Sequence, residues 1–185
     1  MKKILYILLM LSLIMSCGTQ KNTVTKKEAE NKNEVVEEKK NEIKTLKIGD
    51  TIKNSKAEIT IKKIEFSYDV LPDDTSGFYT HYPAESGNVY IHVDTDVKNI
   101  QKQQLGADEI MTVTADYNGG YTYSAEPIPE DSQTGFTYAN ITAIDPLKTL
   151  GVRYLLSVPQ EVEETQNPLK LIFEIEGEKY EYTMR

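Results

Sequence analysis

Residues 88–99 read NVYIHVDTDVKN, and this stretch sets the expectation for the whole chain. Side chains alternate between the two faces of a β-strand, so every second residue shares a face. Here the apolar residues occupy one face, and polar or charged residues occupy most of the other. This pattern is typical of a strand that covers a hydrophobic core with one side. The apolar residues are Val89, Ile91, Val93 and Val97.

The same two-residue period recurs along most of the chain after residue 45. It is present in residues 56–68, 109–117, 150–158 and 169–184. Within the first of these segments the apolar phase slips at Lys62-Lys63, which is what one inserted residue, a β-bulge, would produce. The last segment predicts a closing hairpin that turns at residues 176–177 or 177–178.

These strands predict the fold class. No segment after residue 45 has sustained helical spacing, and each strand has one apolar face. Alternating strands over about 140 residues favour one all-β domain, an antiparallel β-sandwich, spanning residues 45–185. The chain has 185 residues and a single cysteine, so the sandwich has no disulfide framework.

The first sixteen residues predict a cleaved signal peptide. Two lysines precede a twelve-residue apolar run, residues 4–15. A helix of that length spans about 18 Å, which is too short for a hydrocarbon core of about 30 Å. Positive charge before the run and small residues after it are typical of a secretory leader.

The lone cysteine ends this leader. The stretch Ile14-Met15-Ser16-Cys17 resembles the lipobox of bacterial lipoproteins. The resemblance implies cleavage before Cys17 and a diacylglycerol thioether on its sulfur, which makes membrane lipid the first expected partner. Two acyl chains are enough for stable anchoring. The expected location is therefore the outer face of the cell membrane. The alternative is an ordinary cleaved signal with an incidental cysteine.

Residues 17–44 predict a lipidated cysteine followed by a disordered, charged tether. They are rich in lysine, glutamate, asparagine and threonine and contain no aromatic residue. Such a segment buries too little apolar surface to offset the entropy lost on ordering. The formal net charge of the whole chain is −8. An acidic protein repels phosphate backbones, so we expect no nucleic-acid partner.

Several of these motifs together resemble one family. LKIGDTI at 46–52, the strand at 88–99, YLLSVPQEV at 154–162 and the closing hairpin at 169–182 are similar to the telokin-like bacterial lipoprotein domain family (DUF4352-like). One departure is 145–148, DPLK, where that family usually has Pro-Gly. The resemblance implies an immunoglobulin-like sandwich on an exported or anchored protein. It implies no settled biochemical activity.

The sequence offers little that predicts catalysis. It has two histidines, and it lacks the short motifs of serine hydrolases, zinc proteases and phosphate-binding loops. We therefore expect no enzyme, no catalytic residue, no metal and no cofactor. A metal-dependent enzyme is a second alternative, with His92, Asp94 and Asp96 on one strand face as its ligands. The competing interpretation of that row is a solvated polar face.

An acidic segment raises a similar choice. Asp69, Asp73 and Asp74 lie in DVLPDD, which offers oxygen ligands for calcium but lacks the ligand spacing of an EF-hand. Ordinary turn chemistry explains the segment as well.

Two long aromatic connections predict a binding surface. Residues 70–88 are longer than most loops in compact domains, and such loops are often functional. A second connection follows residue 116. Tyrosine combines rigid contact area with a polar end. The candidate surface residues are Tyr79, His81, Tyr82, Tyr121 and Tyr123.

The expected function is thus a membrane-anchored lipoprotein that presents a binding or interaction module. Its partner would be an envelope protein, a peptide or a glycan. The alternative for the aromatic residues is that they only cap the core. The alternative for the whole protein is a structural or accessory subunit of an envelope transporter or signalling complex.

Overall fold

The computed structural model describes residues 42–131, 135–136 and 142–185. Cys17, the predicted signal peptide and the predicted tether up to residue 41 lie outside the described residues. None of the helices in these ranges is long and apolar enough to cross a membrane.

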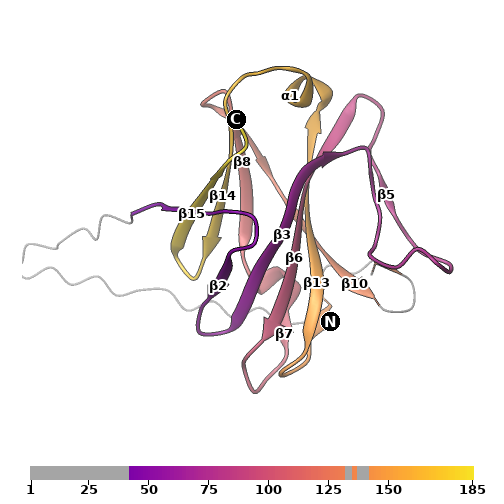
Figure 1. Ribbon diagram of the computed structural model, residues 1–185, viewed down its shortest axis with the longest axis vertical. Coiled ribbons are helices and arrows are strands. Elements are labelled where there is room, and N and C mark those ends of the chain that lie inside the picture. Colours follow the sequence, from indigo (N-terminus) through magenta and orange to yellow (C-terminus); the bar gives the residue numbers. More distant parts are fainter. Residues whose placement is uncertain (1–41, 132–134, 137–141) are drawn as a thin grey trace, which may run out of the picture. The chain divides into compact units, whose positions relative to one another are not determined.

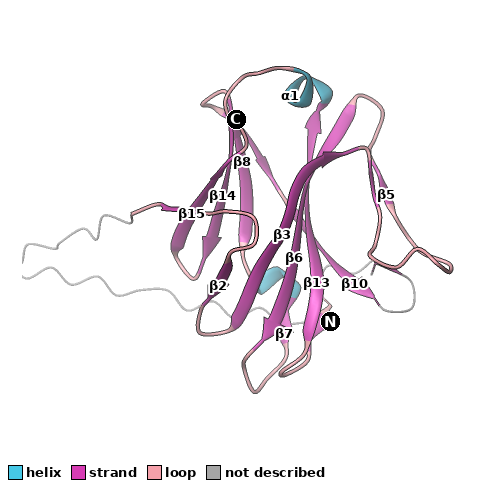
Figure 2. Ribbon diagram, in the orientation of Figure 1, coloured by secondary structure: helices cyan, strands magenta, loops and turns pink. Residues whose placement is uncertain are grey.

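The described residues form fifteen strands and two short helices (Figure 2). The strands up to the middle of the chain are β1 (Lys44–Thr45), β2 (Thr51–Lys53), β3 (Ala57–Ser67), β4 (Asp69–Val70), β5 (Tyr82–Pro83), β6 (Asn88–Asn99), β7 (Leu105–Gly106) and β8 (Thr112–Tyr117). The remaining strands are β9 (Tyr121–Ser124), β10 (Glu126–Asp131), β11 (Gly135–Phe136), β12 (Ala143–Ile144), β13 (Thr149–Pro159), β14 (Leu169–Ile175) and β15 (Glu178–Thr183). The helices are η1 (Ala107–Glu109) and α1 (Gln160–Glu164).

Two sheets pack face to face. One has the order β1-β15-β14-β8-β9, and the other has the order β11-β10-β13-β6-β3-β2. All strand pairs in them are antiparallel except β1 with β15, which are parallel. The predicted all-β antiparallel sandwich is confirmed. Lys44 pairs with Tyr180, so strand pairing begins one residue before the expected start of the domain, and Lys44 does not belong to the tether.

The main core lies between the two sheets and follows the predicted alternation. Val89, Ile91, Val93 and Val97 of β6 are fully buried in it. Strand β13 contributes Val152, Tyr154, Leu156 and Val158, and β14 contributes Leu169, Leu171, Phe173 and Ile175.

The predicted irregularities are present. The pairing of β3 with β6 shifts register between Ile61 and Lys63, which is the β-bulge that the phase slip indicates. The closing hairpin of β14 and β15 turns at Glu176-Gly177, whose φ angles are 49° and 80°. Positive φ at both central residues is the requirement of a type I′ turn, whose twist matches that of the flanking strands.

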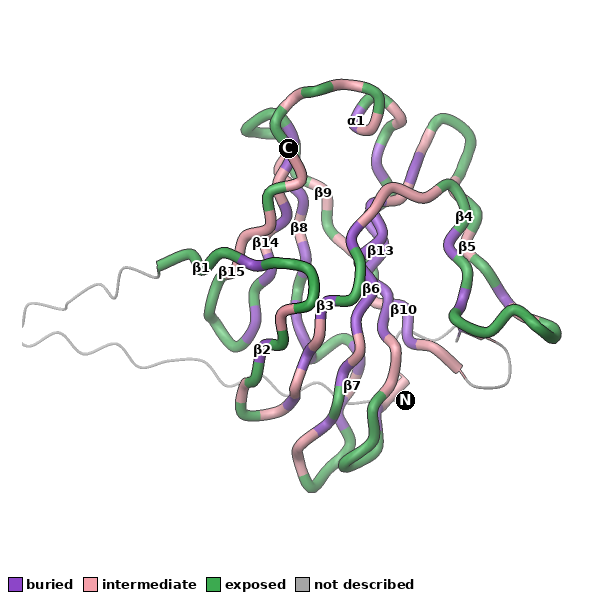
Figure 3. The backbone as a smooth tube through the Cα atoms, viewed as in Figure 1, coloured by how far each residue is buried: buried purple, intermediate pink, exposed green. Residues whose placement is uncertain are grey.

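The outer face of the six-stranded sheet is also covered. Residues 69–83, here named the cap, run from β4 to β5 and lie on the side of this sheet opposite to β8, β14 and β15 (Figure 1). A second, smaller cluster of buried residues forms beneath the cap. As a result β6 and β13 are buried along most of their length (Figure 3). The cluster consists of Val70, Ile128, Phe136 and Leu155, with Tyr82 and Tyr90 packed against it.

Candidate functional site

The polar row of β6 is not a solvated face. His92 is 5% exposed and Asp94 is 6% exposed. The expectation that the outward residues of this strand face water is therefore wrong for both side chains. The strand alternation predicts their direction correctly, but it contains no information on the cap, which covers that face.

Arg153 occupies the centre of this covered face and is 1% exposed. It lies directly opposite Asp94 in the pairing of β13 with β6. Its Nη1 donates to Asp94 Oδ1, and its Nη2 donates to Glu130 Oε1 at 2.5 Å and to Asp73 Oδ1 at 2.7 Å. The three carboxylates come from β6, β10 and the cap, so one guanidinium joins three separate parts of the fold.

Two local features allow these contacts. A Cβ at residue 151 would collide with the Glu130 carboxylate, so Gly151 leaves the space in which Glu130 lies across β13. Lys62, at the bulge of β3, reaches Asp73 at 3.2 Å and Asp96 at 3.6 Å. The network therefore holds two cations among four carboxylates.

Burial and charge shift the pKa values in this network in opposite directions. Burial raises the pKa of Asp94 and of Glu130, and the nearby Arg153 only partly offsets it. Burial also acts on Asp73, but hydrogen bonds and charge from Lys62 and Arg153 outweigh it and lower its pKa. The cap carboxylate thus stays ionised to lower pH than the two carboxylates it covers.

His92 is neutral at pH 7 in this environment. Burial lowers its pKa to about 4, and the charges of Arg153 and Lys63 add to that effect. Its Nδ1 lies 3.6 Å from Glu65 Oε1, and its Nε2 has no hydrogen-bond partner among the described residues. The Asp94 carboxylate accepts a hydrogen bond from Arg153. Within the described ranges, no three or more histidine, cysteine or acidic side chains are arranged to hold a metal ion.

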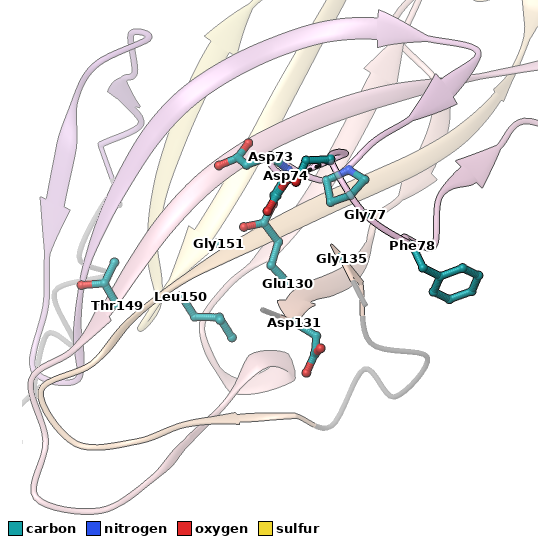
Figure 4. A pocket seen from close by; sticks show the side chains of 12 residues that line it. Asp73, Asp74, Gly77, Phe78, Glu130, Asp131, Gly135, Thr149, Leu150 and Gly151 are labelled. Atoms are coloured by element: carbon teal, nitrogen blue, oxygen red, sulfur yellow. Dashed lines mark hydrogen bonds between the residues drawn. The ribbon is translucent and has the colours of Figure 1, made fainter. Parts of the chain in front are cut away.

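The three carboxylates in the acidic segment of the cap bind different partners. Asp69 Oδ1 lies 2.6 Å from His81 Nδ1. Asp73 binds Arg153 and Lys62, and Asp74 accepts hydrogen bonds from Ser76. A hollow of about 400 Å³ lies beside this segment, and Asp73, Asp74 and Asp131 are among the residues that line it. Figure 4 shows these side chains. The carboxylates of Asp69, Asp73 and Asp74 do not converge on one point, so turn and ion-pair chemistry explains the segment.

The aromatic residues of the cap fall into two groups. The Tyr82 ring packs against Phe136 with ring centroids 5.5 Å apart. Tyr79 contacts His81 edge to face with centroids 6.1 Å apart, and His81 is exposed. Phe78 at the tip is 82% exposed. Only Tyr82 is therefore part of the buried cluster that fixes the cap on the sheet.

A groove brings the two aromatic connections together. It has a volume of about 480 Å³ and lies between the cap side of the molecule and strand β9. Tyr82 and Tyr123 both line it, whereas Tyr79, His81 and Tyr121 do not. Tyr90 and Leu155 of the covered sheet form its floor. The residues that line it are Tyr82, Glu85, Tyr90, Thr122, Tyr123, Ser124, Glu126, Ile128, Leu155 and Ser157.

The sequence patterns do not predict Tyr90, Glu85 and Glu126 as groove residues. Tyr90 lies on the outward face of β6, and its side chain is part of the site only because the cap leaves this end of the face open. Its cross-strand neighbour Ser157 lies opposite it in β13. An aromatic residue among polar ones on an outward strand face is a signal that could have indicated it.

Comparison with known proteins places this sandwich in a family. No family model matches the chain. The crystal structure of an uncharacterized β-sandwich protein from Clostridium difficile 630, determined at 1.90 Å, is 51% identical in sequence, with a TM-score of 0.75. The match covers 78% of this chain and 95% of that one. The chain belongs to the family of this β-sandwich protein.

Two further proteins are similar. The uncharacterized protein YxkC of Bacillus subtilis (strain 168) is 32% identical over 108 residues, which are 58% of this chain and 54% of YxkC. The chain therefore matches about half the length of that relative. A conserved hypothetical protein from Bacillus anthracis, solved at 2.2 Å, is 13% identical with a TM-score of 0.50 over 75% of this chain and 94% of its own. That likeness shows the fold alone.

The pKa of His92 generates a pH prediction. In the unfolded chain a histidine takes up a proton near pH 6.5, whereas folded His92 does so only near pH 4. Between these values the unfolded state binds more protons, so the free energy of unfolding falls as the pH falls. The His92 contribution is fully present above pH 6.5, and its loss towards pH 4 approaches about 3 kcal/mol.

His92→Gln removes this proton uptake. We expect the loss of unfolding free energy between pH 7 and pH 4.5, measured by urea denaturation, to be clearly smaller in the variant than in the unchanged protein. Arg153, Lys63 and Glu65 face His92 and remain in both proteins. Equal losses in the two proteins would contradict the assignment of a neutral, buried His92.

Proposed function

We propose that the chain is a bacterial lipoprotein, anchored by a lipid on Cys17 at the outer face of the cell membrane, which presents its β-sandwich as a binding module. The lipobox-like residues at 14–17 and the leader before them support the anchor. The resemblance of residues 46–184 to the telokin-like lipoprotein domain (DUF4352-like) supports the same assignment.

The groove between the cap and β9 is the observation that carries the binding role. Its walls come from segments about forty residues apart in sequence, and a tyrosine of each segment lines it. Binding sites are typically concave, with apolar and aromatic walls and a few polar groups. Such a groove suits recognition.

The histidines support binding rather than catalysis. General acid–base catalysis needs a titratable group that can reach a substrate. His92 is enclosed beneath the cap, and its pKa of about 4 makes it a weak base. His81 is exposed, and its described partners are the Asp69 carboxylate and the ring of Tyr79.

The anchor generates the first prediction of this proposal. Cys17→Ala removes the sulfur that would carry the diacylglycerol. In cells grown with labelled palmitate, we expect the unchanged protein to be labelled and to sediment with membranes. The variant should remain unlabelled and either unprocessed or outside the membrane fraction. Thr19→Ala, two residues downstream, is the matched control and should keep the label. A labelled C17A protein would refute lipidation at this cysteine.

The groove generates the second prediction of this proposal. Thr122 and Ser157 are exposed and lie on the β9 wall and the β13 wall of the groove. With the photocrosslinker benzoylphenylalanine at either position, irradiated cells should yield the same crosslinked envelope partner. A partner that is a transporter or signalling protein would specify an accessory role.

The control position for this experiment is Glu109, which is exposed on η1 and is not a groove residue. We expect no such partner from it. Equal crosslinking from Glu109, or none from both groove walls in cells that accumulate the protein, would contradict the groove as the binding surface.

A further inference from the structure

The groove has a distinct charge. Two glutamates, Glu85 and Glu126, line it, and none of its lining residues is basic. Both carboxylates lie near the hydroxyl of Tyr90. Burial raises the pKa of Tyr90, and the charges of Glu85 and Glu126 raise it further. Tyrosine rings beside carboxylates attract a cation, because the ring face is electronegative and the carboxylates neutralise the charge. The groove is therefore complementary to a positively charged group.

One wall of the groove is a free strand edge. Strand β9 is the last strand of its sheet, and in the described part of the chain no strand pairs with its other side. The amide of Ala125 donates to Val113 O at 2.9 Å, so Ala125 directs its backbone towards β8. Alternate residues of an antiparallel strand point their backbone groups in opposite directions. The backbone N–H and C=O groups of Thr122 and Ser124 therefore point to the free edge, and both residues line the groove.

This edge is short, but it lacks the side-chain protection that exposed edges often carry. Proteins commonly blunt exposed edges with lysine, proline or a bulge. The four residues of β9 are YTYS, without a charge or a proline. Unpaired backbone groups of this kind bind an extended peptide by strand addition, with neighbouring pockets selecting its side chains.

We propose that the groove binds an extended peptide segment that adds a strand to β9 and places a lysine or arginine side chain between the tyrosine rings and Glu85 and Glu126. This inference rests on the proposed binding role of the groove and gives it a ligand class. Strand addition supplies main-chain hydrogen bonds, and the acidic, tyrosine-lined groove supplies selectivity.

Charge also distinguishes this partner from a second copy of the chain. Pairing two β9 edges would bring the groove carboxylates of both copies close together without a cation between them. Like charges in such proximity are destabilising. A basic peptide neutralises the same carboxylates, so the edge favours it over self-association.

The experiment uses the full-length protein in uncharged detergent micelles and fluorescence anisotropy of labelled peptides. The first peptide has eight residues of alternating threonine and valine with one central lysine. The second has glutamine in place of the lysine. The third keeps the lysine but carries N-methyl groups on alternate backbone amides, which removes the hydrogen bonds of one peptide edge.

We expect the lysine peptide to bind about tenfold more tightly than the glutamine peptide, which is the size of a desolvated cation–π contact. The N-methylated peptide should not bind. In Glu85→Gln/Glu126→Gln the preference for lysine should fall clearly, because only the tyrosine rings remain to bind the cation. The matched control is Asp108→Asn/Glu109→Gln, which removes the same charge from exposed positions of η1 and should keep the preference.

Four results would overturn the inference. Equal binding of the lysine and glutamine peptides excludes the cation site, and undiminished binding of the N-methylated peptide excludes strand addition. If none of the three peptides binds, both the cation site and strand addition are excluded. Self-association of the free protein through β9 excludes both as well. The crosslinking test of the groove uses none of these peptides, so its outcome judges the proposed function separately.

Discussion

The structure depends on how the buried positive charge of Arg153 is paired with carboxylates. Arg153 is almost completely removed from water, and a buried guanidinium is tolerated only when it is paired and hydrogen-bonded. Its three carboxylate partners belong to β6, β10 and the cap. Since Asp73 belongs to the cap, the network is complete only when the cap lies on the sheet. The complete ion network therefore forms only when the cap covers the outer face of the sheet.

The remaining features of this face follow from that arrangement. With the cap in place, Val70 and Phe136 form a second cluster with Leu155, and Tyr82 packs on Phe136. The cap covers His92 and Asp94 but leaves the end of the sheet around Tyr90 open. That open end faces β9, and the groove between them is where both aromatic connections meet. The proposed binding surface thus depends on a contact network that does not itself line the groove.

The sequence predicts the parts of this fold that local patterns control. Alternation identifies the strands, the slip at Lys62-Lys63 identifies the bulge, and the glycine at 177 identifies the closing turn. It does not predict the cap, because the outward residues of β6 have the same polar pattern whether water or another segment faces them. A signal exists in β13, where residues 152–156 read VRYLL, an apolar run interrupted only by Arg153. Strands buried on both faces have such runs. Of the five candidate surface residues, the structure brings only Tyr82 and Tyr123 into the groove. His81 contacts Asp69 and the Tyr79 ring within the cap, and the Tyr121 ring contacts Tyr117.

The most direct test measures amide hydrogen exchange in the cap of Asp73→Asn. This variant removes the charge by which the cap holds Arg153 and leaves Asp94 and Glu130 in place. We expect the amides of Val70, Tyr82 and Ala84 to exchange about tenfold faster, as the loss of a charge-assisted hydrogen bond implies, while the central amides of β6 stay protected. Asp74→Asn, the adjacent carboxylate bound only to Ser76 in the described structure, should leave exchange in the cap unchanged. Unchanged protection of the cap in Asp73→Asn would contradict the claim that the Arg153 network fastens it.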